Sequence, residues 1–202
     1  LSENFIREFQ DKVNWDYISY YQKLSEEFIR EFKDKVNWRY ISIKQKLSEE
    51  FIEEFKNKVN WVCIFQYQKL NEDFIRKFQD KVDWLCISLY QELSEKFIRE
   101  FKHKVSWLYI SSNQKLDENF IREFQNKVYW ERISYCQKLS EEFILEFQDK
   151  INWEYLSSKY GYNLIYFNNK YQIKSNNYCS DLLDFPELVE LTLRLISLKA
   201  FK

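Results

Sequence analysis

VNWDYISYY, residues 13–21, is followed by two near copies, VNWRYISIK at residues 36–44 and VNWVCIFQY at residues 59–67. The tryptophan keeps its place in all three copies, whereas the residue after it is Asp16, Arg39 or Val62. The copies are 23 residues apart. A fixed period of this length is typical of solenoid repeats. The full pattern, LSEEFIREFKDKVNWxYISxYQK, begins at Leu1, Leu24, Leu47, Leu70, Leu93, Leu116 and Leu139.

Each copy contains two helix starts. Its second residue is Ser, Asn or Asp, whose side chains accept a hydrogen bond from the free N–H groups of a first helical turn. Its fourteenth residue repeats this signal, except at Tyr129. We therefore expect a first helix of about ten residues and a second of about seven. Helical periodicity gives them the buried faces Phe5, Ile6, Phe9 and Val13, and Trp15, Ile18, Ser19 and Gln22.

Helices this short do not persist alone in water, so the copies must gain stability by stacking on one another. The tryptophan would then be conserved between copies because it contacts two of them. With one glycine and one proline in 202 residues, barrels and sandwiches are disfavoured, since those folds need many tight turns. The predicted fold is all-α: an αα-solenoid of seven two-helix repeats over residues 1–161, with an atypical C-terminal cap over residues 162–202.

The capping segment departs from the repeat. Alternating apolar residues on both sides of Asn168 and Asn169 indicate a β-hairpin, because asparagine tolerates the backbone of a tight turn. Residues 180–202 then favour a helix that begins near Pro186. Leu191, Leu193 and Leu195 also alternate as in a strand, so that alternative stays open. We expect the segment to cover the apolar end of the last repeat.

The shared pattern FI..F...VNW..IS resembles the short Trp- and Phe-containing repeats of proteins from large DNA viruses that infect amoebae. The resemblance covers Leu1 to about Ser157. It implies an interaction role without an established activity, and a place of action in the cytoplasm of an infected host cell.

Composition limits the classes of function. The net charge is −1 with 31% charged residues, so the chain as a whole does not attract phosphate backbones or anionic membranes. No apolar run approaches the roughly 18 residues of a membrane span, and the charged start is no signal peptide. The four cysteines form no CxxC pair, which favours a soluble, reduced, intracellular protein. Because the repeat pattern is already under way at Leu1, we also expect a longer product upstream.

Two variable positions of each second helix point to a binding surface. The sixteenth and twentieth residues of the repeat lie four apart and face away from the tryptophan. They include acidic, basic, aliphatic and aromatic residues, and exposed apolar residues commonly mark interaction sites. The opposing explanation is that they pack on a neighbouring helix or drifted after duplication. We call the following twelve residues the second-helix surface: Asp16, Tyr20, Arg39, Ile43, Val62, Gln66, Leu85, Leu89, Leu108, Ser112, Glu131 and Tyr135. The seventh copy adds Glu154 and Ser158, and the twenty-first position adds Tyr21, Lys44, Tyr67, Tyr90, Asn113, Cys136 and Lys159.

The predicted function is a non-enzymatic repeat scaffold that binds a protein or peptide through this surface. One alternative is a modular nucleic-acid binder that uses the invariant lysines, Lys12, Lys35, Lys58, Lys81, Lys104, Lys127 and Lys150. The neutral net charge argues against it, and pairing with a glutamate four residues earlier explains the lysines more simply. A second alternative is a structural element that self-associates through its ends.

No pattern indicates an active site or a bound cofactor. His103 is the one histidine, so a zinc site or a Cys–His nucleophile could be assembled only around it. His103 replaces Asp or Asn at a variable polar position, which favours an ordinary exposed side chain. Cys63 and Cys86 occupy the same position of adjacent copies, too far apart for a disulfide if the copies stack at helix-packing distance.

Overall fold

A computed structural model describes residues 1–153, 155, 163–167 and 170–174. Two compact units make up the chain, Leu1–Ser106 and Trp107–Lys202, and each is described by itself. The first unit contains α1 Glu3–Glu8, α2 Trp15–Tyr21, α3 Glu26–Glu31, α4 Trp38–Lys44, α5 Glu49–Glu54, α6 Trp61–Tyr67, α7 Glu72–Lys77, α8 Trp84–Tyr90 and α9 Glu95–Glu100. The second contains α10 Trp107–Asn113, α11 Glu118–Glu123, α12 Trp130–Cys136, α13 Glu141–Glu146, β1 Asn163–Phe167 and β2 Lys170–Lys174.

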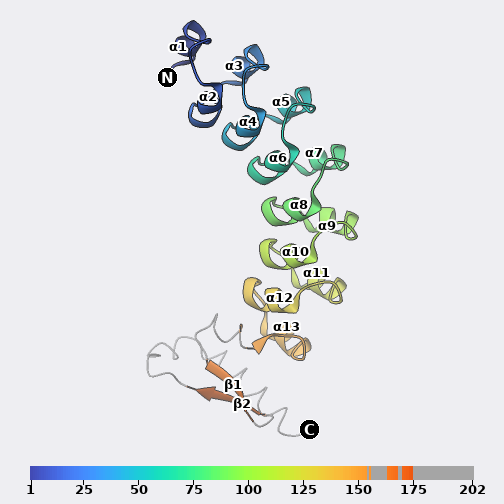
Figure 1. Cartoon of the computed structure of the whole chain (residues 1–202). Coiled ribbons are helices and arrows are strands. Elements are labelled where there is room, and N and C mark those ends of the chain that lie inside the picture. The colour runs from blue at the N-terminus through green and yellow to red at the C-terminus, as the bar shows by residue number, and fades with distance from the viewer. Residues whose placement is uncertain (154, 156–162, 168–169, 175–202) are drawn as a thin grey trace. The chain divides into compact units, whose positions relative to one another are not determined.

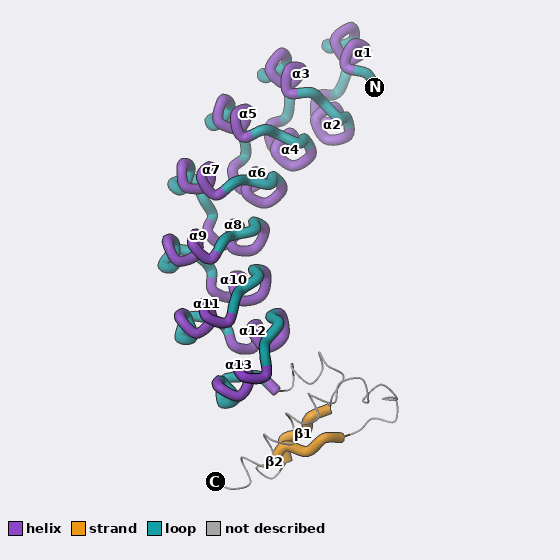
Figure 2. Tube along the Cα trace, turned by 180° about the vertical axis from the view of Figure 1, so that it is seen from behind, coloured by secondary structure: helices purple, strands orange, loops and turns teal. Residues whose placement is uncertain are grey.

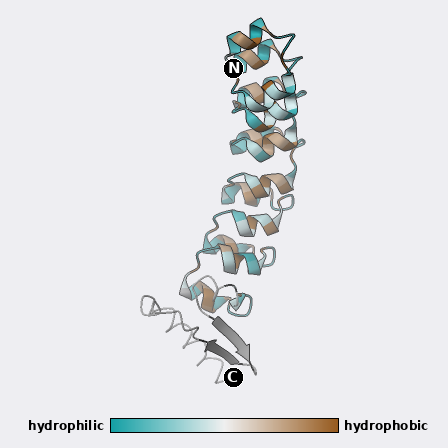
Figure 3. Ribbon diagram, turned by 60° about the vertical axis from the view of Figure 1, so that its left-hand side comes forward, coloured by the Kyte–Doolittle hydropathy of each residue, from teal (hydrophilic) through white to brown (hydrophobic). Residues whose placement is uncertain are grey.

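Helices of the two kinds alternate along the chain and stack in two columns within each unit. In the first unit α1, α3, α5, α7 and α9 form one column, and α2, α4, α6 and α8 form the other (Figure 1, and from behind in Figure 2). The second unit continues the alternation from α10 to α13. The predicted αα-solenoid of 23-residue repeats is therefore confirmed for the described helices. Hydrophobic and hydrophilic residues share each short helix (Figure 3).

The first helix of each repeat begins as predicted and ends earlier. Ser2 accepts a hydrogen bond from the N–H of Phe5, and the caps of α3, α5, α7, α9, α11 and α13 do the same. The predicted length of about ten residues is wrong, because α1 has six. Phe9 leaves the helical backbone at φ −109° and ψ 24°. A turn follows, in which the N–H groups of Lys12 and Val13 both donate to the carbonyl of Phe9. The turn keeps Val13 near the face that helical periodicity had assigned to it.

The second helices begin at the predicted caps. Asn14 accepts from the N–H groups of Asp16 and Tyr17, and Asn37, Asn60 and Asp83 cap α4, α6 and α8 likewise. Tyr129 occupies the cap of α12 and makes no side-chain hydrogen bond to it. The exception seen in the sequence is thus a real loss of a cap.

Each tryptophan joins its own repeat to the next one. Trp15 Nε1 donates to the carbonyl of Gln10, 3.0 Å away, which holds the indole against the turn of its own repeat. Its ring centroid lies 4.9 Å from that of Phe32 and 6.2 Å from that of Phe28, both in the next repeat. Trp38, Trp61 and Trp84 repeat this contact in the first unit, as Trp107 and Trp130 do in the second. Two separate contacts therefore constrain this position.

A buried glutamine makes the second link between repeats. Gln45 Nε2 donates to the carbonyls of Ser19 and Gln22 in the preceding repeat, at 3.2 and 2.8 Å. Its Oε1 accepts from the N–H of Leu24, at 3.0 Å, in its own repeat. Gln68, Gln91 and Gln137 make the same three kinds of bond. Because every polar atom of the buried amide is bonded, it adds specificity without a desolvation penalty.

A buried serine makes the third link. Ser19 Oγ donates to the carbonyl of Trp15 and accepts from the N–H of Asn37 in the next repeat, at 2.7 and 2.9 Å. Ser19 is fully buried, as the helical wheel predicted. The hydroxyl therefore fixes where the second helix of the next repeat begins.

Arginines make the outermost link. Arg7 Nε lies 2.8 Å from Glu31 Oε2 in the next repeat, and its guanidinium covers the Phe28 ring at 5.1 Å. Arg30, Arg76 and Arg122 pair with Glu54, Glu100 and Glu146 in the same way. Between the third and fourth repeats the charges are exchanged, since Glu53 pairs with Lys77. Phe74, which no arginine covers there, is 6% exposed, whereas Phe28, Phe51 and Phe97 are fully buried.

The tail contains the predicted hairpin. Strands β1 and β2 pair antiparallel, with Asn163 opposite Lys174 and Phe167 opposite Lys170. The predicted helix over residues 180–202 and its role as a cap lie outside the described residues.

Replacing the tryptophan of an interior repeat should unfold the stack. We expect Trp61→Ala to lower the free energy of unfolding by about 3 kcal/mol, because it removes both the indole packing on Phe78 and the bond to the carbonyl of Lys56. Urea denaturation followed by circular dichroism measures the loss. The exposed Lys46→Ala change should stay within about 0.5 kcal/mol. A loss below 1 kcal/mol for Trp61→Ala would contradict the assigned role.

The ion pair between Glu53 and Lys77, in which the charges are exchanged relative to the other repeats, should give a measurable coupling energy between the two residues. Either Glu53→Arg or Lys77→Glu alone places like charges together, whereas the double variant restores the pairing of the other repeats. Since the pair is exposed, we expect a coupling of about 0.5 kcal/mol in a double-mutant cycle of urea denaturations. Additive effects of the two substitutions would show that the pair does not couple the repeats.

Restoring the missing helix cap should stabilise the second unit. We expect Tyr129→Asn to raise the free energy of unfolding by about 1 kcal/mol, because Asn can accept from the free N–H groups of α12. The reciprocal Asn60→Tyr change should cost a similar amount, since Asn60 accepts from the N–H of Cys63. Thermal and urea denaturation of both variants check this. A Tyr129→Asn protein no more stable than the parent would refute it.

Candidate binding surface on the second helices

The sixteenth position of the repeat is the exposed half of the second-helix surface. Its side chains lie at the start of each second helix, on the side away from the tryptophan. Leu108 is half-buried, and the remaining members, Asp16, Arg39, Val62, Leu85 and Glu131, are exposed. Glu154 and Ser158 lie outside the described residues. The variable residue after each tryptophan is therefore in contact with solvent in most described repeats.

The twentieth position is mostly half-buried, because it reaches the second helix of the next repeat. The Tyr20 ring meets the Tyr40 ring edge-on at 5.2 Å, and Tyr135 meets Tyr155 edge-on at 5.9 Å. Ile43, Gln66, Leu89 and Ser112 are half-buried too, whereas Tyr135 is exposed. In most of the predicted pairs that the structure describes, the sixteenth residue is therefore exposed and the twentieth is half-buried.

Apolar and aromatic residues gather on the outer side of α6 and α8. Val62 is 52% exposed and Leu85 is 50% exposed, and Tyr67 and Tyr90 are also exposed. An open depression of about 260 Å³ lies beside them, lined by Gln66, Tyr67, Gln68, Lys69, Leu70, Tyr90, Gln91 and Glu92. A large apolar side chain that stays in water on two successive repeats is the usual sign of a contact surface.

A second depression lies on the first two repeats. It has a volume of about 490 Å³ and is lined by Asn14, Asp16, Tyr17, Tyr20, Tyr21 and Tyr40. Sequence reasoning missed Tyr17 and Tyr40, because it treated their position only as the place that Cys63 and Cys86 fill elsewhere. The signal was available in the run DYISYY, which brings three tyrosines onto one short helix.

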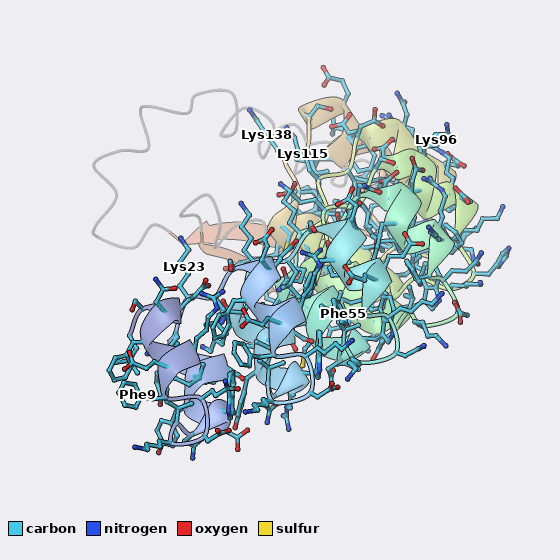
Figure 4. The ribbon with its side chains drawn as sticks, turned by 90° about the horizontal axis from the view of Figure 1, so that it is seen from above. Phe9, Lys23, Phe55, Lys96, Lys115 and Lys138 are labelled. Carbon is cyan, nitrogen blue, oxygen red and sulfur yellow. The ribbon has the colours of Figure 1, made fainter. Side chains whose placement is uncertain are left out.

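Most of the invariant lysines contact the preceding repeat, whereas Lys12 and Lys81 contact Phe9 and Asp80 of their own repeats. Lys35 Nζ lies 2.9 Å from Asp11 Oδ1 and 5.9 Å from the centre of the Trp15 ring, and Lys58 Nζ lies 2.6 Å from Asp34 Oδ1. Lys104, Lys127 and Lys150 also lie over the preceding tryptophan. The sequence favoured a structural role for these lysines, in which each pairs with the glutamate four residues earlier in its own repeat. Lys35 and Lys58 instead pair with aspartates of the preceding repeat. Figure 4 shows Phe55 among the helices and Lys23 extending away from them.

Interactions across repeats also shift several pKa values. The hydrogen bond from Lys58 lowers the pKa of Asp34, and the hydrogen bond to Glu54 raises the pKa of Arg30. Burial, with Asp83 nearby, raises the pKa of the Cys86 thiol, so this cysteine stays protonated and poorly nucleophilic. Cys63 and Cys86 are both buried and free, as predicted.

The described residues contain no cluster of three or more His, Cys, Asp or Glu side chains suited to a metal ion. His103 is exposed, as its variable position predicted. Among the described helices, none has the length and apolar character needed to cross a bilayer.

Comparison of the chain with known sequence families, curated proteins and solved structures returns no match. The resemblance to the viral repeats stays a prediction.

Proposed function

We propose that the protein is a non-enzymatic repeat scaffold that binds a protein or peptide partner through the second-helix surface. The observation that carries this proposal is the exposure of Val62 and Leu85 on adjacent second helices, beside Tyr67 and Tyr90. Exposed apolar patches commonly mark interaction sites, and tyrosine is enriched at protein interfaces. Within this proposal the protein acts inside a cell, where its thiols stay reduced, and the resemblance to viral repeats is our reason for proposing the cytoplasm of an infected host cell.

Variation between repeats supports the same proposal. Residues that join the repeats, such as Trp38 and Gln45, recur with little change because each has a fixed partner in a neighbouring repeat. The residue directly after the tryptophan has no partner that recurs from repeat to repeat, although Asp16 bonds to Asn37, and it varies between charged and apolar types. A surface whose chemistry changes from repeat to repeat suits an extended partner that meets each repeat with a different side chain.

A nucleic-acid partner is the first alternative. In the lysine row that would follow a phosphate backbone, Lys35 and Lys58 are already paired with Asp11 and Asp34, and Asp16 and Glu131 add negative charge to the exposed face. Salt dependence separates the two functions, since phosphate binding weakens steeply as ionic strength rises. Self-association through the ends of the repeat array is the second alternative, and light scattering over a concentration series tests it.

The proposal can be tested on the two exposed aliphatic residues. Peptides that bind the full chain are first selected from a displayed random library. We then expect Val62→Asp combined with Leu85→Asp to weaken the selected peptides by at least about tenfold, because two buried contacts are replaced by desolvated charges. Isothermal calorimetry measures the affinities, and circular dichroism checks that both proteins fold alike. Leu89 is left unchanged, since it is half-buried and its loss would confound folding with binding.

A matched control adds the same two negative charges elsewhere. Asn57→Asp with Gln79→Glu changes exposed residues of the turns that follow the first helices, and it should leave peptide affinity within about twofold. If the selected peptides bound the Val62 and Leu85 variant as tightly as the parent, this surface would not be the binding site.

A further inference from the structure

The depression on the first two repeats has the composition of a cation site. Four of its six lining residues are tyrosines, Tyr17, Tyr20, Tyr21 and Tyr40, and a fifth is Asp16. Faces of aromatic rings attract cations through the ring quadrupole, and a carboxylate beside them adds direct charge attraction. The residues come from α2 and α4, which are adjacent in the column of second helices.

The rings support one another and leave two of them open to solvent. The centre of the Tyr20 ring lies 4.6 Å from that of Tyr21 and 5.2 Å from that of Tyr40, with both pairs edge-on. The centre of the Tyr17 ring lies 5.7 Å from that of Tyr21, and these two rings are nearly parallel. Tyr20 and Tyr40 are half-buried, but Tyr17 is 65% exposed and Tyr21 is 67% exposed. Tyr20 therefore supports Tyr21, and Tyr21 in turn supports Tyr17, before any ligand arrives, which lowers the entropy cost of binding.

One ring already carries a cation from the chain itself. Lys44 Nζ lies 4.3 Å from the centre of the Tyr20 ring. That contact shows that a positive group is stable at this cluster, and it occupies Tyr20 alone. Tyr17 and Tyr21 have no cation of the described residues over them.

Asp16 has one oxygen in use and one available. Its Oδ1 accepts from Asn37 Nδ2, 2.7 Å away, which fixes the carboxylate against the next repeat. Its other oxygen accepts no hydrogen bond from the residues that the structure describes. Lys44 and the exposed Arg39 offset the negative charge of Asp16, so general attraction between opposite charges would not select a ligand here. The ring faces must supply the selectivity.

We propose that this pocket binds an arginine side chain of the peptide partner, with its guanidinium against Tyr17 and Tyr21 and an N–H donating to Asp16. This proposal rests on the proposed function and names the partner chemistry at one end of the second-helix surface. A guanidinium is planar and weakly hydrated, so it stacks on aromatic rings while it donates in its own plane. An ammonium lacks both properties, and the partner arginine is therefore preferred over lysine.

The other repeats of the first unit provide an internal comparison. The third and fourth repeats place Val62 and Leu85 where the first has Asp16, and Cys63 and Cys86 where it has Tyr17. A single tyrosine remains in each, Tyr67 or Tyr90. The third and fourth repeats thus lack the aromatic and acidic composition of this pocket and present an apolar surface instead.

The test titrates the full chain with three short peptides of the form acetyl-Gly-Gly-X-Gly-Gly-amide, where X is arginine, lysine or citrulline. Backbone amide shifts in nuclear magnetic resonance spectra report the site and the affinity. We expect the arginine peptide to shift residues of α2 and α4, the lysine peptide to bind more weakly and the neutral citrulline peptide to cause no shifts. Equal binding of citrulline and arginine, or of lysine and arginine, would overturn the proposal.

Two variants test the individual contacts. Tyr17→Ala with Tyr21→Ala removes only exposed rings, and it should weaken the arginine peptide by about fivefold or more. Asp16→Asn keeps an oxygen for Asn37 and removes the charge, and it should weaken the peptide by about threefold. The control variant, Tyr129→Ala, removes an exposed ring outside this pocket, and it should leave the affinity of the arginine peptide unchanged. Unaltered arginine binding by the Tyr17 and Tyr21 variant would show that the rings are not the site.

These outcomes are independent of the test on Val62 and Leu85. The arginine peptide, with shifts followed at α2 and α4, tests the pocket around Tyr17 and Tyr21, whereas the Val62 and Leu85 variant tests α6 and α8. Loss of arginine binding with intact peptide selection would refute this inference alone. The reverse result would refute the wider proposed function and leave a separate cation site.

Discussion

The packing of each tryptophan on two phenylalanines of the next repeat is the contact on which the rest of the structure depends. Helices of six and seven residues are too short to be stable alone, so the stability of this fold must lie between repeats. The indole supplies a large apolar area, and its N–H, bonded to the turn carbonyl of its own repeat, leaves no buried donor unpaired. One side chain therefore bonds to the turn of its own repeat and packs on the first helix of the next repeat.

The same contact explains why the outer side of the second helix is free to vary. The inner side and the end of the second helices are taken up by Trp15, Ser19 and the Gln45 amide. The residue after the tryptophan makes no contact between repeats that recurs in every copy. The residues exposed on the outer side of the second helix differ from repeat to repeat. The first gathers tyrosines around Asp16, and the third and fourth expose Val62 and Leu85. One scaffold thus presents both a polar aromatic pocket and an apolar surface.

Charge pairs distinguish interfaces between repeats that are otherwise similar, and so influence which repeats can stack on each other. Most described interfaces pair an arginine with a glutamate of the next repeat, and the arginine also covers a phenylalanine. At the interface of the third and fourth repeats Glu53 and Lys77 exchange these charges. Either repeat placed beside a different neighbour would set like charges against each other, which disfavours misregistered stacking. The weak energy of one exposed pair is sufficient for this purpose, since it acts only on the choice between alternatives.

Local chemistry in the sequence determined the repeat, the helix starts and most of the buried faces, because caps and helical periodicity act over a few residues and need no knowledge of the neighbours. Phe5, which periodicity assigned to the buried face, is 42% exposed, whereas the equivalent Phe28 of the second repeat is fully buried. Ser2, Asn14 and the exception at Tyr129 are all where the sequence placed them. The first helix was predicted too long because Val13 continues its periodicity, although a turn closed on the carbonyl of Phe9 now carries that residue. Only the tertiary structure decided the partners of Gln45 and Lys35, the half-burial of Tyr20 and the pocket around Tyr17. Those features depend on contacts between adjacent repeats, and the distance and angle between stacked repeats set them.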